Sequence, residues 1–323
     1  MVARRQLIAA GRRLGGALAT LWLLASLSFV AVRLAPGDPA RVTDPEVPAS
    51  YRQSLAHLYG LDRPLPKQYT AWLSGWLRGD LGWSFQQRRP VAAVLADALP
   101  STVLLAVAAL AMQYTLALAL AVWTAGRGLA LRRAVAGLAL LLYCLPTFWL
   151  GLLALHWLAH GWGLLPAYGS RSIATEIAGM QLLGDLLRHV LLPAAVLALA
   201  GLSTVYGLTE QALRETLATL HVLAARAKGV SELRLLWVHA LRNAAGAATH
   251  RLGLDLPALA SGALVVEVLF SRPGLGRVAH QAFLARDFPL LAAGATAAGG
   301  LIVAGSLLAD LLHGVLDPRV RHG

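Results

Sequence analysis

Apolar residues in this chain gather into long stretches, separated by segments that hold most of the charge. A hydrocarbon core about 30 Å thick requires roughly 20 mostly apolar residues per helix. Six stretches meet that requirement: Leu14–Leu34, Thr102–Trp123, Ala134–Ala159, Val190–Leu208, Leu252–Phe270 and Leu290–Leu312. The fifth is the weakest because Asp255, Pro257 and Glu267 interrupt it. The pattern predicts an all-α integral membrane protein with six transmembrane helices.

Several arginines precede the first stretch, just as basic residues precede the apolar region of a signal peptide. Its apolar run is long, however, and continues to Arg33 and Pro36 without a small-x-small cleavage site. We therefore expect an uncleaved first span. Gly294, Ala297, Ala298 and Gly305 in the last stretch predict close helix packing, within the bundle or against a sister subunit.

Basic residues predict which segments face the cytoplasm. Short segments on one side hold an excess of Arg and Lys, as in 127–133 and 226–251. By the positive-inside rule, both termini are expected in the cytoplasm, with a large periplasmic loop from Ala35 to about Leu99. The expected organisation is a first transmembrane helix plus periplasmic loop over 1–99, and a five-helix core over 100–323. A cytoplasmic loop at about 209–250 belongs to that core.

Composition supports the membrane class. Hydrophobic residues make up 57% of the 323 positions and charged residues only 14%, whereas a soluble domain has about 45–50% apolar and about 25% charged residues. The net charge of +12 would suggest nucleic acid in a soluble protein. Here the topology accounts for most of the excess, and no nucleic-acid partner is expected. The single cysteine, Cys144, excludes an internal disulfide and a Cys-based metal site.

The chain lacks the sequence motifs of an energy-converting or hydrolytic site. It has no phosphate-binding G-x-x-x-x-G-K-[ST], no H-E-x-x-H and no G-x-S-x-G. A membrane protein without such a site, if it does work, uses an ion gradient or takes its energy from a partner.

The predicted cytoplasmic loop carries an amphipathic pattern too polar to span the membrane. Leucines at helical spacing predict one helix through Leu213, Leu217, Leu220 and Leu223. Gly229 indicates its end, with cations in the last turn. Ser231 is expected to cap a second helix with an apolar stripe at Leu233, Leu236, Trp237 and Leu241. A short helix outside the membrane suits docking into a groove on a partner.

Several motifs resemble binding-protein-dependent ABC importer permeases. LAARAKG at 223–229 resembles the coupling motif E-A-A-x-x-x-G of that family. HALRNA at 239–244 and VVEVLFSRPGLG at 265–276 are similar to motifs of its dipeptide/oligopeptide/nickel branch, of the first-permease type. Further matches are LAPGDP at 34–39, LRGDLGWS at 77–84, RDFP at 286–289 and LDPRVR at 316–321. The resemblance covers essentially the whole chain, in order.

The resemblance implies a MetI-like ABC importer permease fold and a place in the bacterial inner membrane. It also implies a second homologous permease subunit, two cytoplasmic ATP-binding subunits and an extracytoplasmic substrate-binding protein. ATP and Mg²⁺ bind to the partner ATPases, so this chain is a translocation subunit and not an enzyme, with no cofactor of its own. The residues expected to couple it to an ATPase are Leu220, Leu223, Ala224, Ala225, Arg226, Lys228 and Gly229.

Two positions depart from the family pattern. Leu223 stands where the coupling motif has its Glu, and Ala247 stands where a Pro usually closes the motif. Without that Pro, the helix there is expected to run on into span five.

Two acids lie within the predicted fifth span, where ionisable groups are functional candidates. Each acid has two possible interpretations. One is a pathway or gating role; the other is a structural contact, which for Glu267 is a helix-end hydrogen bond to the backbone and for Asp255 an ion pair with Arg251. Pro273, Gly274 and Gly276 are further gating candidates from the resemblance.

His156 and His160, four residues apart, are weak metal-ligand candidates without a third ligand nearby in sequence. Interfacial or hydrogen-bonded histidines are the favoured interpretation, and no metal site is expected.

The expected cargo is a di- or oligopeptide, with nickel or a metal chelate as the alternative in this branch. A gradient-driven secondary carrier is a remoter alternative, since it would need ion-coupling acids inside several spans and paired repeats. A membrane-embedded enzyme is disfavoured because no acids or metal ligands converge along any two spans.

Overall fold

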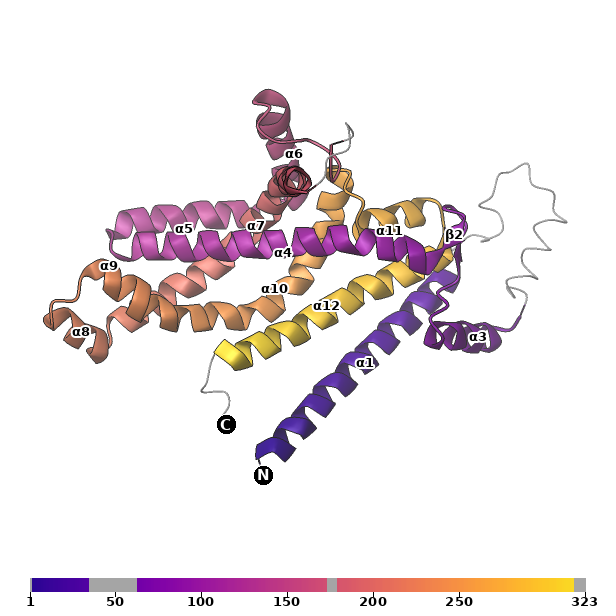
Figure 1. Ribbon diagram of the computed structural model, residues 1–323, viewed down its shortest axis with the longest axis horizontal. Coiled ribbons are helices and arrows are strands. Elements are labelled where there is room, and N and C mark those ends of the chain that lie inside the picture. The colour runs from indigo at the N-terminus through magenta and orange to yellow at the C-terminus, as the bar shows by residue number, and fades with distance from the viewer. Residues whose placement is uncertain (1, 35–62, 173–178, 317–323) are drawn as a thin grey trace. The chain divides into compact units, whose positions relative to one another are not determined.

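The structure, a computed structural model, describes residues 2–34, 63–172 and 179–316, and these segments are mostly helical (Figure 1). The motifs at 34–39 and 316–321 lie almost wholly outside the described residues, as does much of the predicted periplasmic loop. The chain divides into two compact units, which are 1–100 with 274–303, and 101–273 with 304–323.

Among its described residues, the first unit holds five helical segments and a small hairpin. Its elements are α1 (Val2–Leu34), α3 (Leu65–Leu77), β1 (Trp83–Ser84), β2 (Arg89–Pro90), α11 (Leu275–Leu284), the start of α4 (Val91–Ala125) and most of α12 (Phe288–Leu316). The strands pair antiparallel, with Trp83 opposite Pro90. The core lies between the start of α4, α11 and α12, where Val91, Leu275 and Leu290 are buried.

The second unit is a helical bundle. Its elements are the rest of α4, α5 (Leu129–Cys144), α6 (Thr147–Ala154), the π-helical η2 (Leu155–Gly161), α7 (Met180–Leu217), α8 (Leu220–Ala227), α9 (Glu232–Arg234), the π-helical η3 (Leu235–Ala240), α10 (Leu241–Leu269) and the end of α12. Helix α7 packs against α5 and α10. Gly262 permits this approach, because a Cβ there would lie 2.9 Å from the Leu197 side chain. Gly305 similarly allows α12 to approach α10 closely. Of the two options predicted for the small residues of the last stretch, packing within the bundle therefore holds at Gly305.

Within the described residues, five helices are long and apolar enough to span a membrane, and a bent pair makes a sixth if it counts as one span. The five correspond to the predicted first, second, fourth, fifth and sixth spans. The predicted third span, Ala134–Ala159, is not one straight helix, since α5 and α6–η2 meet at 102°. The bend lies at Leu145, which is extended (φ −79°, ψ 137°) before Pro146. Proline disfavours helical backbone in the residue before it and lacks an N–H, so the helix ends there.

Candidate functional site

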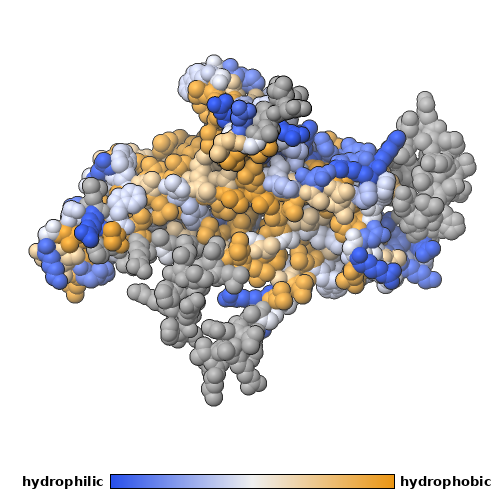
Figure 2. Space-filling view, in the orientation of Figure 1, coloured by the Kyte–Doolittle hydropathy of each residue, from blue (hydrophilic) through white to orange (hydrophobic). Residues whose placement is uncertain are grey.

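The coupling segment, here residues 219–240, lies at the ends of α7 and α10 opposite α6 (Figure 1). Within it α8 is short and largely exposed. Leu220 is 83% exposed and Leu223 44%, whereas Val222 is fully buried. The surface over α8 and α9 mixes hydrophilic with hydrophobic residues (Figure 2). Exposed apolar residues on a helix with a polar surround are typical of a protein-docking surface.

A rigid turn at Gly229 ends α8. The Gly229 N–H donates to the Arg226 carbonyl at 3.0 Å, and the Val230 N–H donates to the Ala225 carbonyl at 3.3 Å. Gly229 has φ +81°, the left-handed conformation that such a helix end requires. The predicted helix stop is therefore confirmed, and its chemical reason is that glycine adopts this φ without a steric penalty.

One ion pair bridges the turn. Arg226 Nε and Nη2 donate to the two Glu232 carboxylate oxygens at 2.7 and 3.0 Å, so the pair is bidentate. Hydrogen bonding to Glu232, followed by its negative charge, raises the pKa of the Arg226 guanidinium. Both side chains are exposed, so the pair orients α8 against α9 and contributes little to the free energy of unfolding.

The segment differs in two respects from the sequence prediction. The helix expected through Leu213 and Leu223 is two helices, because the chain turns at residues 218–219 between α7 and α8. Leu213 is buried in the core of the second unit while Leu220 is exposed, so the leucines do not form one stripe. The absence of a break before span five is confirmed, since η3 continues directly into α10 through Ala247.

Two exposed apolar residues beside α8 were not among the predicted docking residues. Trp237 and Val238 on η3 are 53% and 54% exposed, and η3 contacts α8. The sequence predicts Trp237 in one apolar stripe with Leu236, but Leu236 is buried and Trp237 is exposed. The sequence does hold a signal, because four consecutive apolar residues at 235–238 exceed what one helical face buries.

A buried polar cluster joins α4, α7 and α10 in the second unit. Glu267 is fully buried, and its carboxylate accepts a hydrogen bond from Thr102 Oγ1 at 2.6 Å. Arg272, 1% exposed, donates from Nη1 to the His189 carbonyl at 3.0 Å. Burial lowers the pKa of the Arg272 guanidinium, and the charge of Glu267 opposes that shift. The two interpretations of Glu267 from sequence did not include this side-chain partner on α4.

Asp255 belongs to a second polar cluster. Its carboxylate accepts from Arg251 Nε at 3.0 Å and from Tyr114 Oη at 2.8 Å, and Asp255 is only 5% exposed. The expected ion pair with Arg251 is confirmed. Tyr114, which links α4 to α10, was not predicted from the sequence because it lies 141 residues away.

Residues 270–274 connect α10 to α11, and Gly276 lies in the first turn of α11. Ser271 has φ +51°, and the chain leaves α10 there. Gly274 is the residue before α11, with an extended backbone (φ −111°, ψ 176°). Pro273 is exposed and Gly276 half-buried. The gating role of Pro273, Gly274 and Gly276 stays a prediction.

The first unit brings two family motifs together. Ser84 Oγ donates to Asp287 Oδ2 at 2.5 Å, and the Gln86 N–H donates to the same oxygen at 3.0 Å. Both Ser84 and Asp287 are buried. The carboxylate thus ties the hairpin to the start of α12.

His156 and His160 lie in η2 but do not belong to a metal-binding cluster among the described residues. His160 Nδ1 is 2.9 Å from the Leu155 carbonyl, and the His156 ring packs edge-on against Trp157. Among the described residues, no group of three His, Cys, Asp or Glu side chains has a geometry suited to a metal ion.

The described helices are those of a multi-pass helical membrane protein. The chain belongs to the family described as binding-protein-dependent transport system inner membrane component, which matches residues 113–322. The N-terminal domain of the same transport-system membrane components matches residues 6–106. The chain is therefore an inner-membrane component of a transport system, as its motifs indicated.

Its relatives cover nearly the full length. The dipeptide transport system permease protein DppB of Escherichia coli K12 is 33% identical, over 96% of this chain and 98% of the relative. The oligopeptide transport system permease protein AppB of Bacillus subtilis is 32% identical, over 92% and 93%. The di/tripeptide transport system permease protein DppB of Pseudomonas aeruginosa is 33% identical, over 96% and 98%.

Proposed function

We propose that this chain is the translocation subunit of an ATP-driven importer for di- or oligopeptides. It works with a second homologous permease, two cytoplasmic ATP-binding subunits and an extracytoplasmic binding protein that delivers the peptide. The observation that carries the proposal is α8, a short helix with exposed Leu220 and Leu223 and a rigid end at Gly229. The family to which the chain belongs supports it.

The covalent continuity around α8 explains how a partner would move the spans. Two residues separate α8 from α7, and a short turn with α9 leads into η3 and α10 without a further break. Helices α7 and α10 pack on each other. A displacement of α8 by an ATPase is therefore delivered to two packed helices of the bundle together. The bidentate pair between Arg226 and Glu232 keeps the turn from absorbing that displacement.

Nucleotide chemistry belongs to the partner chains in this proposal. ATP and Mg²⁺ bind there, and this chain supplies the docking helix and the membrane path. The residues assigned to ATPase docking are Leu220, Leu223, Ala224, Ala225, Arg226, Lys228 and Gly229, with Trp237 and Val238 added beside them.

The docking assignment is tested with the assembled importer in proteoliposomes. Gly229→Arg and Ala225→Glu should abolish ATP-dependent peptide uptake and co-purification of the ATPases, while the protein stays inserted. Gly126→Arg is the matched control, because Gly126 lies in a loop predicted on the same side, with open space around it. Normal uptake and co-purification by the Gly229 and Ala225 variants would overturn the docking assignment.

The peptide assignment rests on the relatives, whose names specify dipeptides, di/tripeptides and oligopeptides. The test loads the cognate binding protein with a labelled dipeptide or a nickel chelate and measures uptake into proteoliposomes containing ATP. Dipeptide uptake supports the proposal. Uptake of nickel chelate alone would replace the peptide assignment, and ATP-independent uptake driven by an ion gradient would replace the importer mechanism.

A further inference from the structure

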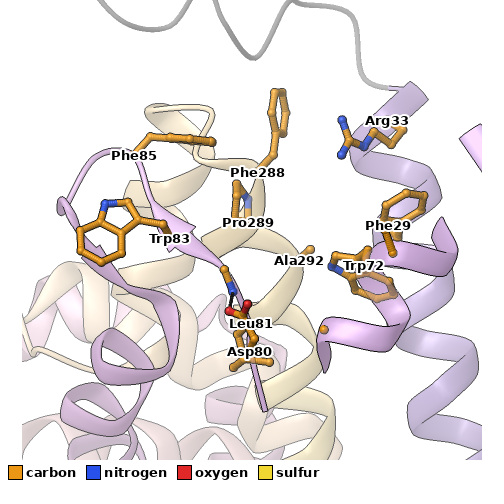
Figure 3. A pocket seen from close by; sticks show the side chains of 13 residues that line it. Phe29, Arg33, Trp72, Asp80, Leu81, Trp83, Phe85, Phe288, Pro289 and Ala292 are labelled. Atoms are coloured by element: carbon orange, nitrogen blue, oxygen red, sulfur yellow. Dashed lines mark hydrogen bonds between the residues drawn. The ribbon is translucent and has the colours of Figure 1, made fainter. Parts of the chain in front are cut away.

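Two cavities adjoin the C-terminal end of α1 in the first unit. The first cavity, about 230 Å³ in volume, is lined by Arg33, Trp72, Asp80, Phe288 and Pro289, among others (Figure 3). Figure 3 shows Arg33 projecting from the end of α1 toward Phe288. The walls thus combine aromatic rings with one cation and one carboxylate.

The second cavity, about 260 Å³, is almost wholly apolar. Val30, Leu34, Leu65 and Pro66 line it, between the end of α1 and the start of α3. Phe29 and Arg33 line both cavities. A single guanidinium therefore lies where two clefts adjoin.

Arg33 has no acidic partner in the part of the chain that the structure describes. Its side chain is half-buried, and its guanidinium carbon lies 5.3 Å from the Phe29 ring centroid. Asp80, which lines the first cavity with Arg33, accepts a hydrogen bond from the Gly82 N–H at 2.9 Å. A half-buried cation without a carboxylate partner favours an external anion, because a charge removed from water requires compensation.

The aromatic residues beside Arg33 indicate the level of the membrane surface. The apolar span of α1 ends at Ala31, two residues before Arg33. Rings of Phe29, Tyr69 and Trp72 pack together there, with centroids 5.0–6.0 Å apart. Trp and Tyr gather at the headgroup level of bilayers, where lipid phosphates also lie.

We propose that this site binds one membrane phospholipid with a zwitterionic headgroup. Its phosphate binds the Arg33 guanidinium, and its acyl chain lies along the cleft formed by Val30, Leu65 and Pro66. The headgroup ammonium lies on the side of Asp80, whose carboxylate disfavours a purely anionic headgroup. The lipid would secure α3 against α1 at the membrane surface.

The experiment counts phospholipids retained by the protein purified in mild detergent, using native mass spectrometry with added phosphatidylethanolamine or phosphatidylglycerol. The unmodified protein should retain one phosphatidylethanolamine in preference to phosphatidylglycerol. Arg33→Gln should weaken that binding about tenfold, the effect of losing one charge-assisted hydrogen-bonded contact. Arg78→Gln is the matched control, because Arg78 is exposed directly after the end of α3 and lines neither cavity.

Two further variants separate the acyl chain from the charge. Val30→Trp fills the apolar cleft without changing any charge and should also weaken binding, while Arg33→Lys should retain much of it. Asp80→Asn should remove the preference for phosphatidylethanolamine over phosphatidylglycerol. Thermal unfolding of each variant shows whether it is folded.

Several outcomes would overturn the proposal. Unchanged retention in both Arg33→Gln and Val30→Trp would exclude a lipid at this site. Equal competition by glycerophosphoethanolamine, which has no acyl chains, would identify a soluble phosphate ligand instead. If Arg33→Gln weakened only capture of the external binding protein, the site would be a protein contact. None of these measurements depends on transport.

Discussion

Polar residues are exposed in the coupling segment but buried in the cluster around Glu267. In the coupling segment Arg226 and Glu232 are exposed, and apolar Leu220 faces outward beside them. In the cluster Glu267 and Arg272 are fully buried and hydrogen-bonded to other helices of the second unit. A polar group is expensive to bury without partners. The cluster therefore holds helices together, whereas the coupling segment leaves apolar side chains exposed on its surface.

Removing the buried carboxylate of Glu267 is expected to change the free energy of unfolding more than any other substitution in these two regions. Glu267→Ala leaves Thr102 without this acceptor and Arg272 without a compensating charge, which should reduce the free energy of unfolding by about 3–5 kcal/mol. Thermal unfolding in detergent measures this loss. Glu267→Gln keeps an acceptor for Thr102 and should lose less. Equal melting temperatures for Glu267→Ala and the unmodified protein would show that the cluster does not hold the helices.

The second cluster should show a smaller effect. Tyr114→Phe removes one hydrogen bond to the Asp255 carboxylate while Arg251 stays in place, at an expected cost of about 1.5–3 kcal/mol. Tyr143→Phe is a matched control, because Tyr143 is 56% exposed. A loss as large in the control as in Tyr114→Phe would contradict the role of this bond.

In the coupling segment, the backbone conformation at Gly229 is expected to affect the order of α8 more than the ion pair does. Gly229→Ala forces a Cβ into the left-handed region, at a cost of about 1–2 kcal/mol. We expect faster hydrogen exchange of the α8 amides, with little change in the melting temperature of the bundle. Gly126→Ala, at a glycine without positive φ, should leave exchange in α8 unchanged. Unchanged exchange in the Gly229 variant would mean that the turn does not order α8.

The smallest effect on stability is expected from the exposed ion pair. Arg226→Gln should leave the melting temperature unchanged within error, because solvent screens both charges. Coupled transport should fall, since the turn would then absorb part of the displacement of α8. The measurement is uptake per ATP hydrolysed in proteoliposomes, with Arg214→Gln as an exposed control on α7. A large drop in melting temperature would contradict the distinction between the two regions.

The sequence predicted the features that depend on short segments, and it did not predict those that depend on contacts between distant residues. The five straight spans and the stop at Gly229 follow from local rules, because apolar length and one glycine's φ are properties of short segments. The partners of Glu267 and Asp255 lie 165 and 141 residues away, so no spacing rule reaches them. The bend at Pro146 had a local signal that the span prediction did not use.

By itself the sequence determined the membrane class, the places of five spans, the family and the end of α8 at Gly229. These follow from hydropathy, motif order and turn chemistry, which do not require knowledge of neighbouring helices. Only the tertiary structure decided that α8 separates from α7, that Trp237 is exposed, and that Thr102 and Tyr114 partner the buried acids. Burial and pairing depend on which helix surfaces meet, and that is a property of the packed bundle.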